Sequence, residues 1–270
     1  MLRTSRWTIA RFLRSKGFST PRAFSSSNLV EEYGLLPLFP PATCEALRRD
    51  LEEDGFCILN NFASKDVAQA MRNEAQRLFD EGYMFQSMSV DEHGRSFPKD
   101  NVFASELDGN EWDVAPTILH YTRSVMLQAP EMLNSMFPEL QISSRAYATK
   151  LAVSLGDGAS YPKHCDTAGL PDQRKVTMVY YLNPNWEPSH GGQLQVYAKD
   201  GVHVVEPRSD TLAVFWSDQV VHDVKPCENS PSDVAAQRFA LTLWLVTDDP
   251  KQIIDPNHPL YDLRCQHFQS

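Results

Sequence analysis

After Arg145 the sequence breaks into short runs of β-branched and aromatic residues, separated by Gly, Pro, Asn and Asp. Such runs predict strands, because these side chains suit a pleated, half-buried surface. No helix-length pattern interrupts them, so we expect about seven or eight antiparallel strands folded as a sandwich or jelly roll. The expected strands are 146–155, 176–182, 193–197, 203–206, 211–216, 220–224 and 239–246.

Helical periodicity dominates the first half of the chain. Apolar residues recur on one side of each pattern, as in amphipathic helices that pack on a sheet. Ser64 is a good N-cap for the second of these helices. We therefore expect a mainly β fold with N-terminal helices packed on one sheet. The expected helices are 41–51, 65–80 and 116–136, and a strand is expected over 55–62.

Residues 84–112 are polar, contain glycine and lack a clear period. We interpret them as an irregular segment, long enough to form a lid over the mouth of the β fold. A surface loop with no part in binding is the alternative interpretation.

Composition excludes several classes of protein. The chain has 270 residues, of which 42% are hydrophobic, and this is enough for one packed domain. Five scattered cysteines without a Cys-x-x-Cys pair argue against a disulfide framework or a thiolate zinc site. A net charge of −10 argues against nucleic acid and anionic membranes as partners. No apolar run approaches the ~20 residues needed to span a bilayer.

The first 30 residues differ from the rest of the chain. They are rich in Arg and Ser and contain neither Asp nor Glu, which is the composition of an organelle transit peptide. A disordered basic leader is the alternative. The transit-peptide interpretation predicts import into a mitochondrion or plastid, and without import the protein is expected to be cytoplasmic.

Two histidines and one carboxylate are candidate metal ligands. His164 and Asp166 are two residues apart, so in an extended segment their side chains point to the same side. His222 lies in another extended segment and could supply a second imidazole. This is the ligand set of the facial triad in non-heme Fe(II) oxygenases, although a zinc site would use similar ligands and each residue alone is weak evidence.

Arg238 begins an otherwise apolar strand. Alternation places Arg238 and Thr242 on one face of this strand, with the large apolar side chains on the other. A buried guanidinium needs an anionic partner, and its fork matches a carboxylate. Taken alone, Arg238 could equally be a strand end that faces solvent; together with the candidate ligands, it favours a site for an anion.

The order and spacing of these residues resemble the 2-oxoglutarate- and Fe(II)-dependent oxygenases, in particular the prolyl 4-hydroxylase-like group that includes the oxygen-sensing prolyl hydroxylases. The resemblance spans about residues 146–248 and implies a double-stranded β-helix (jelly roll). It is carried by Tyr161-Pro-Lys-His-Cys-Asp166, Arg174-Lys-Val-Thr-Met-Val-Tyr-Tyr-Leu-Asn183, Trp186, Gly191-Gly-Gln-Leu194, Phe215-Trp-Ser-Asp218, His222 and Arg238-Phe-Ala-Leu-Thr-Leu-Trp244.

The resemblance implies a role for each matching residue. It assigns iron to His164, Asp166 and His222. It assigns the distal carboxylate of 2-oxoglutarate to Arg238. Tyr181 matches the tyrosine that assists this carboxylate, and the positions lining the cosubstrate slot are matched by Thr242, Val179 and Leu194.

Some features remain open or depart from the family. The neighbours Tyr180 and Tyr181 alternate, so one packs in the core, and the pair alone does not say which. A tyrosine found in many relatives ahead of the first histidine is replaced here by Ser154. Gly191-Gly192 is interpreted as a hairpin turn.

The implied activity is hydroxylation of a C–H bond, most simply of a prolyl residue in a protein, with release of succinate and CO2. Fe(II), 2-oxoglutarate and O2 are the implied cofactor and cosubstrates, with L-ascorbate as reductant. A small-molecule hydroxylase of the same fold and a non-catalytic metal-binding jelly roll are the alternatives. The expected organisation is a leader (1–30), a helical support with the candidate lid (31–145), the oxygenase core (146–248) and a tail (249–270).

Overall fold

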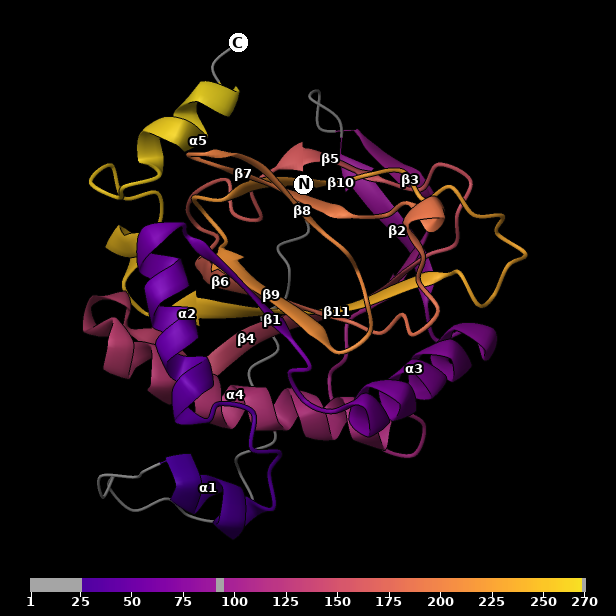
Figure 1. Ribbon diagram of the computed structural model, residues 1–270, viewed down its shortest axis with the longest axis horizontal. Helices are drawn as coiled ribbons and strands as arrows, with labels where there is room; N and C mark the ends of the chain where they lie inside the picture. The colour runs from indigo at the N-terminus through magenta and orange to yellow at the C-terminus, as the bar shows by residue number, and fades with distance from the viewer. Residues whose placement is uncertain (1–25, 91–94, 269–270) are drawn as a thin grey trace.

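A computed structural model describes residues 26–90 and 95–268 of the chain. Two facing antiparallel sheets form its centre, with helices on the outer side of the larger sheet (Figure 1). The predicted transit peptide lies outside the described residues, apart from residues 26–30 at the start of the first helix. The predicted mainly β fold with N-terminal helices is confirmed.

The larger sheet has seven strands, in the order β1-β9-β6-β11-β4-β3-β2. Its central strands come from the β-rich half of the chain, and β1 closes one edge by pairing with β9. Their bounds are β1 Phe56–Asn60, β2 Phe85–Val90, β3 Ser96–Ser105, β4 Ile142–Ser154, β6 Arg174–Tyr181, β9 Thr211–Trp216 and β11 Arg238–Thr247.

The smaller sheet has four strands, in the order β5-β10-β7-β8. Its strands are β5 Tyr161–His164, β7 Leu194–Ala198, β8 Gly201–Val205 and β10 Val221–Val224. The chain crosses repeatedly from one sheet to the other, which is the double-stranded jelly-roll arrangement.

The larger sheet is covered by helices because one face of its central strands is wholly apolar. Along β11, Phe239, Leu241 and Leu243 are fully buried on that face. The helix α4 contacts β4 and begins and ends where the sequence predicted. Ser64 caps α3, accepting a hydrogen bond of 3.2 Å from the amide of Val67. The helices are α1 Ser26–Tyr33, α2 Pro41–Glu53, α3 Lys65–Asp80 and α4 Pro116–Met136.

The interpretation of residues 84–112 as irregular is wrong for most of the segment. Two strands, β2 and β3, form a hairpin that extends the large sheet, with Val102 of β3 opposite Ser154 of β4. Val102 is buried, so the inner half of the hairpin belongs to the fold. The strands escaped prediction because several of their apolar residues face solvent and break the expected alternation: Phe85, Met88 and Phe97 are all exposed.

The C-terminal segment returns to the smaller sheet. A short 3-10 helix (η4, Pro250–Gln252) leads to α5 (Tyr261–Phe268), whose His267 ring lies 5.0 Å from the ring of Tyr197 on β7.

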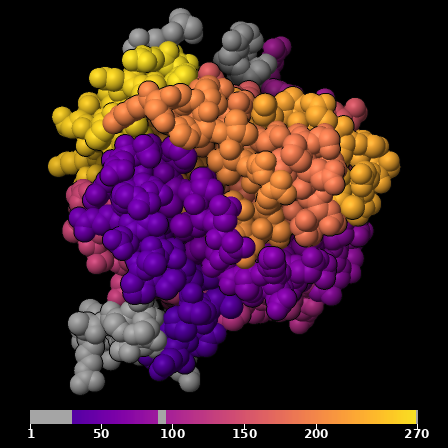
Figure 2. Space-filling view, in the orientation of Figure 1, coloured from indigo at the N-terminus to yellow at the C-terminus, as the bar shows by residue number. Residues whose placement is uncertain are grey.

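In Figure 2, the indigo N-terminal part of the chain lies directly against the orange part, which comes from the second half of the chain. Among residues 26–90 and 95–268, no helix is long and apolar enough to cross a membrane.

Candidate active site

Two strands of the smaller sheet bring two histidines together. His164 ends β5 and His222 lies on β10, and the two residues are direct partners across the ladder, with ring centroids 4.3 Å apart. Each Nδ1 contacts a backbone carbonyl two residues earlier in the chain, Pro162 at 2.7 Å and Val220 at 3.1 Å. Because a carbonyl can only accept, Nδ1 is the protonated nitrogen and each Nε2 keeps a free lone pair.

Asp166 completes a cluster of three ligands. Its Oδ1 lies 3.7 Å from Nε2 of His164 and 3.9 Å from Nε2 of His222. Its Oδ2 accepts a 2.6 Å hydrogen bond from the Thr177 hydroxyl on β6. One carboxylate oxygen is thus held by the large sheet, and the other faces both imidazoles.

Electrostatics keep Asp166 ionised. Burial alone would raise the pKa of the carboxyl, but the neighbouring His164 and His222 rings and the hydrogen bond from the Thr177 hydroxyl hold the pKa below its usual range. Burial lowers the pKa of His222 and favours its neutral form, although the Asp166 charge opposes this. An anionic carboxylate at Asp166 and a neutral imidazole at His222 are the protonation states that a metal ion requires.

One ligand atom from each of these residues lies within 4.8 Å of the others, so the cluster could hold a metal ion. Two imidazoles and one carboxylate on one side of an ion leave its other positions open to exogenous ligands. The donor set fits ferrous iron. The structure thus brings together all three residues that the sequence predicted as ligands.

Arg238 is buried at the start of β11, on the inner face of the large sheet. Its Nε donates a 2.7 Å hydrogen bond to the carbonyl of Gly192. A Cβ at position 192 would meet Arg238 Cδ and Cys227 Sγ at 2.8 Å, so glycine allows this close approach. Gly191-Gly192 is therefore not a hairpin turn: it leads from a 3-10 helix (η3, Pro188–His190) into β7 and packs against Arg238.

The two adjacent tyrosines of β6 have different surroundings. Tyr180 belongs to the core, where it stacks on Tyr121 and donates a 2.7 Å hydrogen bond to Asp210. Tyr181 points to the inner face, with its ring centroid 5.2 Å from the guanidinium carbon of Arg238. Burial raises the pKa of Tyr181, against the charge of Arg238, so the phenol remains protonated.

A buried phenol and a buried guanidinium face each other at this point. The Tyr181 hydroxyl is buried without a hydrogen-bond partner among the described residues. Arg238 uses its Nε for the hydrogen bond to Gly192, and its guanidinium faces Tyr181. Buried donors are rarely left unsatisfied. A carboxylate is the ligand that would satisfy a guanidinium fork and a phenol together.

The paired strands β6 and β11 run from the metal cluster to Arg238 and form one wall between them. Trp244 lies opposite Thr177, Thr242 opposite Val179, and Ala240 opposite Tyr181. From Thr177 to Tyr181 the strand rises about 13 Å. Thr242 and Val179 lie between the two ends and are only partly buried. An elongated anion can span this slot from the metal cluster to Arg238.

The remaining predicted positions lie at the margins of the slot. Leu194 is buried in β7, two residues after Gly192. Ser154 lies directly opposite Arg238 in the β4–β11 ladder. The sequence did not identify Thr177, whose contact with Asp166 depends on tertiary structure. Lys150 was considered from the sequence as an alternative cation for the carboxylate of 2-oxoglutarate, and alternation along β4 places it on the same face as Ser154.

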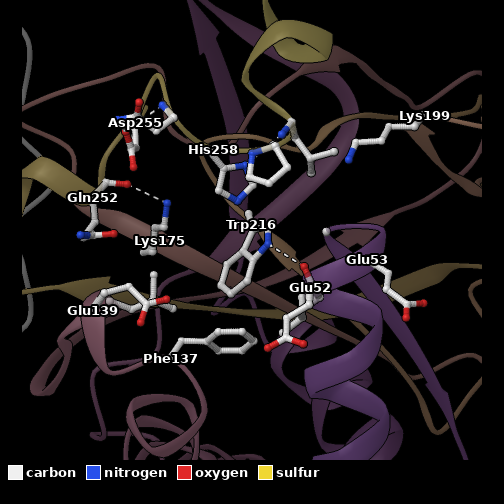
Figure 3. Close-up of a pocket in the computed structure, with 16 residues that line it drawn as sticks. Glu52, Glu53, Phe137, Glu139, Lys175, Lys199, Trp216, Gln252, Asp255 and His258 are labelled. Carbon is white, nitrogen blue, oxygen red and sulfur yellow. Dashed lines mark hydrogen bonds between the residues drawn. The ribbon is translucent and has the colours of Figure 1, made fainter.

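A pocket of about 330 Å³ lies apart from these residues, between the end of α2, β9 and the C-terminal segment (Figure 3). None of the candidate metal ligands lines it, nor does Arg238. Its most buried cation, Lys175, is held by the carboxylate of Asp218 at 3.0 Å and donates to the Gln252 carbonyl. Because this charge is already compensated, the pocket lacks the open donors found at Arg238.

Fold and site together define a dioxygenase-class oxidoreductase built on a jelly roll. Residues 149–246 match the family model of the 2OG-Fe(II) oxygenase superfamily. A solved prolyl hydroxylase of Trichoplax adhaerens, in complex with a hypoxia-inducible factor peptide fragment, is 27% identical with a TM-score of 0.66 and covers 77% of this chain and 90% of its own. A Pseudomonas putida prolyl-4-hydroxylase is 26% identical with a TM-score of 0.61, over 76% and 100% of the two chains.

Curated relatives agree with these structures. A hypoxia-inducible factor prolyl hydroxylase of Caenorhabditis elegans is 29% identical over 74% of this chain and 28% of its own length. The prolyl hydroxylase EGLN3 of Mus musculus is 28% identical over 72% of this chain and 79% of its own. The chain is thus similar to the prolyl hydroxylases of the 2OG-Fe(II) oxygenase superfamily, and it matches little more than a quarter of the length of the Caenorhabditis elegans protein.

Proposed function

We propose that this protein hydroxylates a C–H bond of a prolyl residue in a protein or peptide, using Fe(II), 2-oxoglutarate and O2 and releasing succinate and CO2. The observation that carries the proposal is the inner face of the large sheet. It holds Arg238 and Tyr181 at one end and, at the other, Thr177, which fixes the carboxylate of the metal cluster.

The protein's residues have separate tasks in this proposal. His164, Asp166 and His222 bind the iron, which supplies the oxidative chemistry when bound. Arg238 and Tyr181 bind the distal carboxylate of 2-oxoglutarate, and Thr242, Val179 and Leu194 line the slot. These residues orient the cosubstrate and exclude water from it. L-ascorbate is proposed as the reductant that keeps the iron ferrous.

A peptide-sized substrate is supported by the surface beside the site. The β2–β3 hairpin carries exposed apolar side chains, of which Phe85 is 70% exposed and Met88 54%. Lys99 of the same hairpin contacts Tyr161 of β5, three residues before His164. An apolar surface next to a catalytic opening suits an extended peptide more than a small polar molecule. Prolyl hydroxylases among the relatives support the choice of proline.

The test is anaerobic loading with Fe(II) and 2-oxoglutarate, followed by oxygen and by detection of succinate and of a hydroxylated product across a proline-containing peptide panel. We expect a matching peptide to accelerate succinate formation, because substrate completes the closed site. Metal and 2-oxoglutarate binding without oxygen-dependent succinate would instead identify a non-catalytic binding module.

A further inference from the structure

Two lysines and a tyrosine meet at the opening of the site. Lys99 of β3 places its Nζ 4.1 Å from the ring centroid of Tyr161, and Nζ of Lys150 on β4 lies 6.0 Å from the same centroid. Tyr161 begins β5, the strand that ends at His164. Three strands distant in sequence thus deliver two ammonium groups to one aromatic ring beside the metal cluster.

Lys150 belongs to the inner face of the slot. It lies directly opposite Thr242 in the β4–β11 ladder, while Ser154, four residues along β4, lies opposite Arg238. Lys150 is therefore about 13 Å along the strand from the Arg238 end. Its electrostatic neighbours include Asp166 of the metal cluster. Tyr161, whose ring this ammonium faces, has Arg238 among its own electrostatic neighbours, so the ammonium lies between the metal cluster and Arg238.

Neither ammonium forms an ion pair with a carboxylate of the described residues, although Asp166 and Glu106 oppose the charge of Lys150. Within residues 26–90 and 95–268, no ion pair and no side-chain hydrogen bond involves Lys99 or Lys150. Burial lowers the pKa of both lysines, and that of Lys99 falls to about 8, with Lys150 adding to its shift. Two like charges in a half-buried cluster are unfavourable unless an anion joins them.

The catalytic components do not supply that anion. The two positive charges of a ferrous ion, the negative charge of Asp166 and the positive charge of Arg238 would leave two positive charges. The two carboxylates of 2-oxoglutarate would balance them. Arg174, the other guanidinium near this opening, is already paired with Asp172. Glu106 directly follows Ser105, which pairs with Leu151, and its carboxylate opposes the charge of Lys150. One positive charge of the lysine pair then remains in excess.

We infer that Lys99 and Lys150, with Tyr161 beneath them, bind a carboxylate of the substrate, so that the molecule hydroxylated carries an acidic group close to the reacting C–H bond. The inference rests on the proposed function and narrows its substrate class. The same chemistry could come from Asp or Glu side chains flanking a proline in a peptide, or from the free carboxylate of an amino acid.

The test compares matched ligands on the anaerobic Fe(II)–2-oxoglutarate protein. Two blocked decapeptides contain one proline, flanked within three positions by Glu in one and by Gln in the other; free L-proline and L-prolinamide form the second pair. We expect the wild type to bind the acidic member of one pair at least about tenfold more tightly than its neutral match. A preference in the first pair identifies an acidic peptide, and one in the second pair a free amino acid.

Variants then assign the preference to the lysines. Lys150→Met and Lys99→Met should each weaken binding of the acidic ligand by about tenfold and leave binding of the neutral ligand unchanged. Lys99→Met, which lies outside the cosubstrate slot, should also leave the Kd of 2-oxoglutarate unchanged. Lys150→Arg should keep the preference, and Lys150→Glu should transfer it to a decapeptide flanked by Lys. Lys199→Met, in the exposed turn between β7 and β8, is the matched control for loss of one positive charge.

Three results would overturn the inference: equal binding of the acidic and neutral ligands by the wild type, equal weakening of both ligands by Lys150→Met, or weaker binding of 2-oxoglutarate by Lys99→Met. Succinate is measured in the same samples after oxygen is admitted. Lysine-dependent carboxylate binding without succinate would reject the proposed hydroxylation but support the carboxylate site. Hydroxylation without any carboxylate preference would support the proposed hydroxylation but reject the carboxylate site.

Discussion

The Thr177 hydroxyl donates a 2.6 Å hydrogen bond to Oδ2 of Asp166, which leaves Oδ1 facing both histidines. Thr177 in turn contacts the hydroxyl of Ser217 at 2.7 Å. Since Thr177 uses its proton on Asp166, Ser217 is the donor in that second bond. The orientation of a metal ligand from the loop after β5 is thus set by β6, in the opposite sheet.

Thr177→Val should weaken metal binding, because valine has nearly the shape of threonine but cannot orient the carboxylate. Loss of such a supporting hydrogen bond typically costs 10–100-fold in metal affinity, and we expect about tenfold here. Anaerobic titration with Fe(II) measures it. Ser217→Ala is the control: it removes the second bond and spares the one to Asp166, so an equal loss in both variants would contradict a specific role for Thr177.

Replacing any one of His164, Asp166 and His222 by Ala should abolish succinate formation and strongly weaken Fe(II) binding. The expected fold is unchanged, because the ligands lie between the sheets and not in the apolar layer under the helices. Far-UV circular dichroism checks the fold, and succinate assays check activity. Wild-type turnover in His222→Ala would remove that histidine from the ligand set.

Arg238→Lys should reduce the affinity for 2-oxoglutarate and leave Fe(II) binding intact. Lysine keeps the positive charge but loses the planar fork, which removes a charge-assisted hydrogen bond of about 1.5–3 kcal/mol. Isothermal titration with 2-oxoglutarate on the Fe(II)-loaded, anaerobic protein measures the change. An unaltered Kd would mean that another cation meets the distal carboxylate.

Tyr181→Phe and Tyr180→Phe should have opposite effects on stability. Removing the unpartnered Tyr181 hydroxyl should leave the free energy of unfolding of the apoprotein unchanged or raise it by up to about 1 kcal/mol, while the Kd of 2-oxoglutarate rises. Tyr180→Phe loses the hydrogen bond to Asp210 and should destabilise by about 1–3 kcal/mol without a change in that Kd. Urea unfolding with ligand titration separates the two; destabilisation by Tyr181→Phe would place its hydroxyl in the core network instead.

Arg72→Met should destabilise the fold by about 3 kcal/mol or more. Arg72 of α3 is buried and donates to three backbone carbonyls, those of Leu182, Val234 and Gln237, and to the side chain of Asn183. Methionine fills similar volume but leaves these acceptors unpaired next to the start of β11. Thermal and urea unfolding measure the loss. Arg48→Met, in an exposed pair on α2, is the matched control and should change stability by less than about 1 kcal/mol.

Alternation along a strand is a local property, and for this reason the sequence alone determined much of this protein. The two-residue spacing of His164 and Asp166 and the period of β11 predicted which side chains share a face, and the family resemblance supplied their roles. The helix over 116–136 and the Ser64 cap were predicted for the same local reason.

Only the tertiary structure decided what depends on register between distant strands. It placed Tyr181 beside Arg238 and Tyr180 in the core, and it set Thr177 against Asp166. It also paired β2 with β3, several of whose apolar side chains face solvent. It also brought Lys99 and Lys150 to Tyr161. A sequence period fixes the side to which a residue points, but which residue it meets there is set by strand pairing and by packing between sheets.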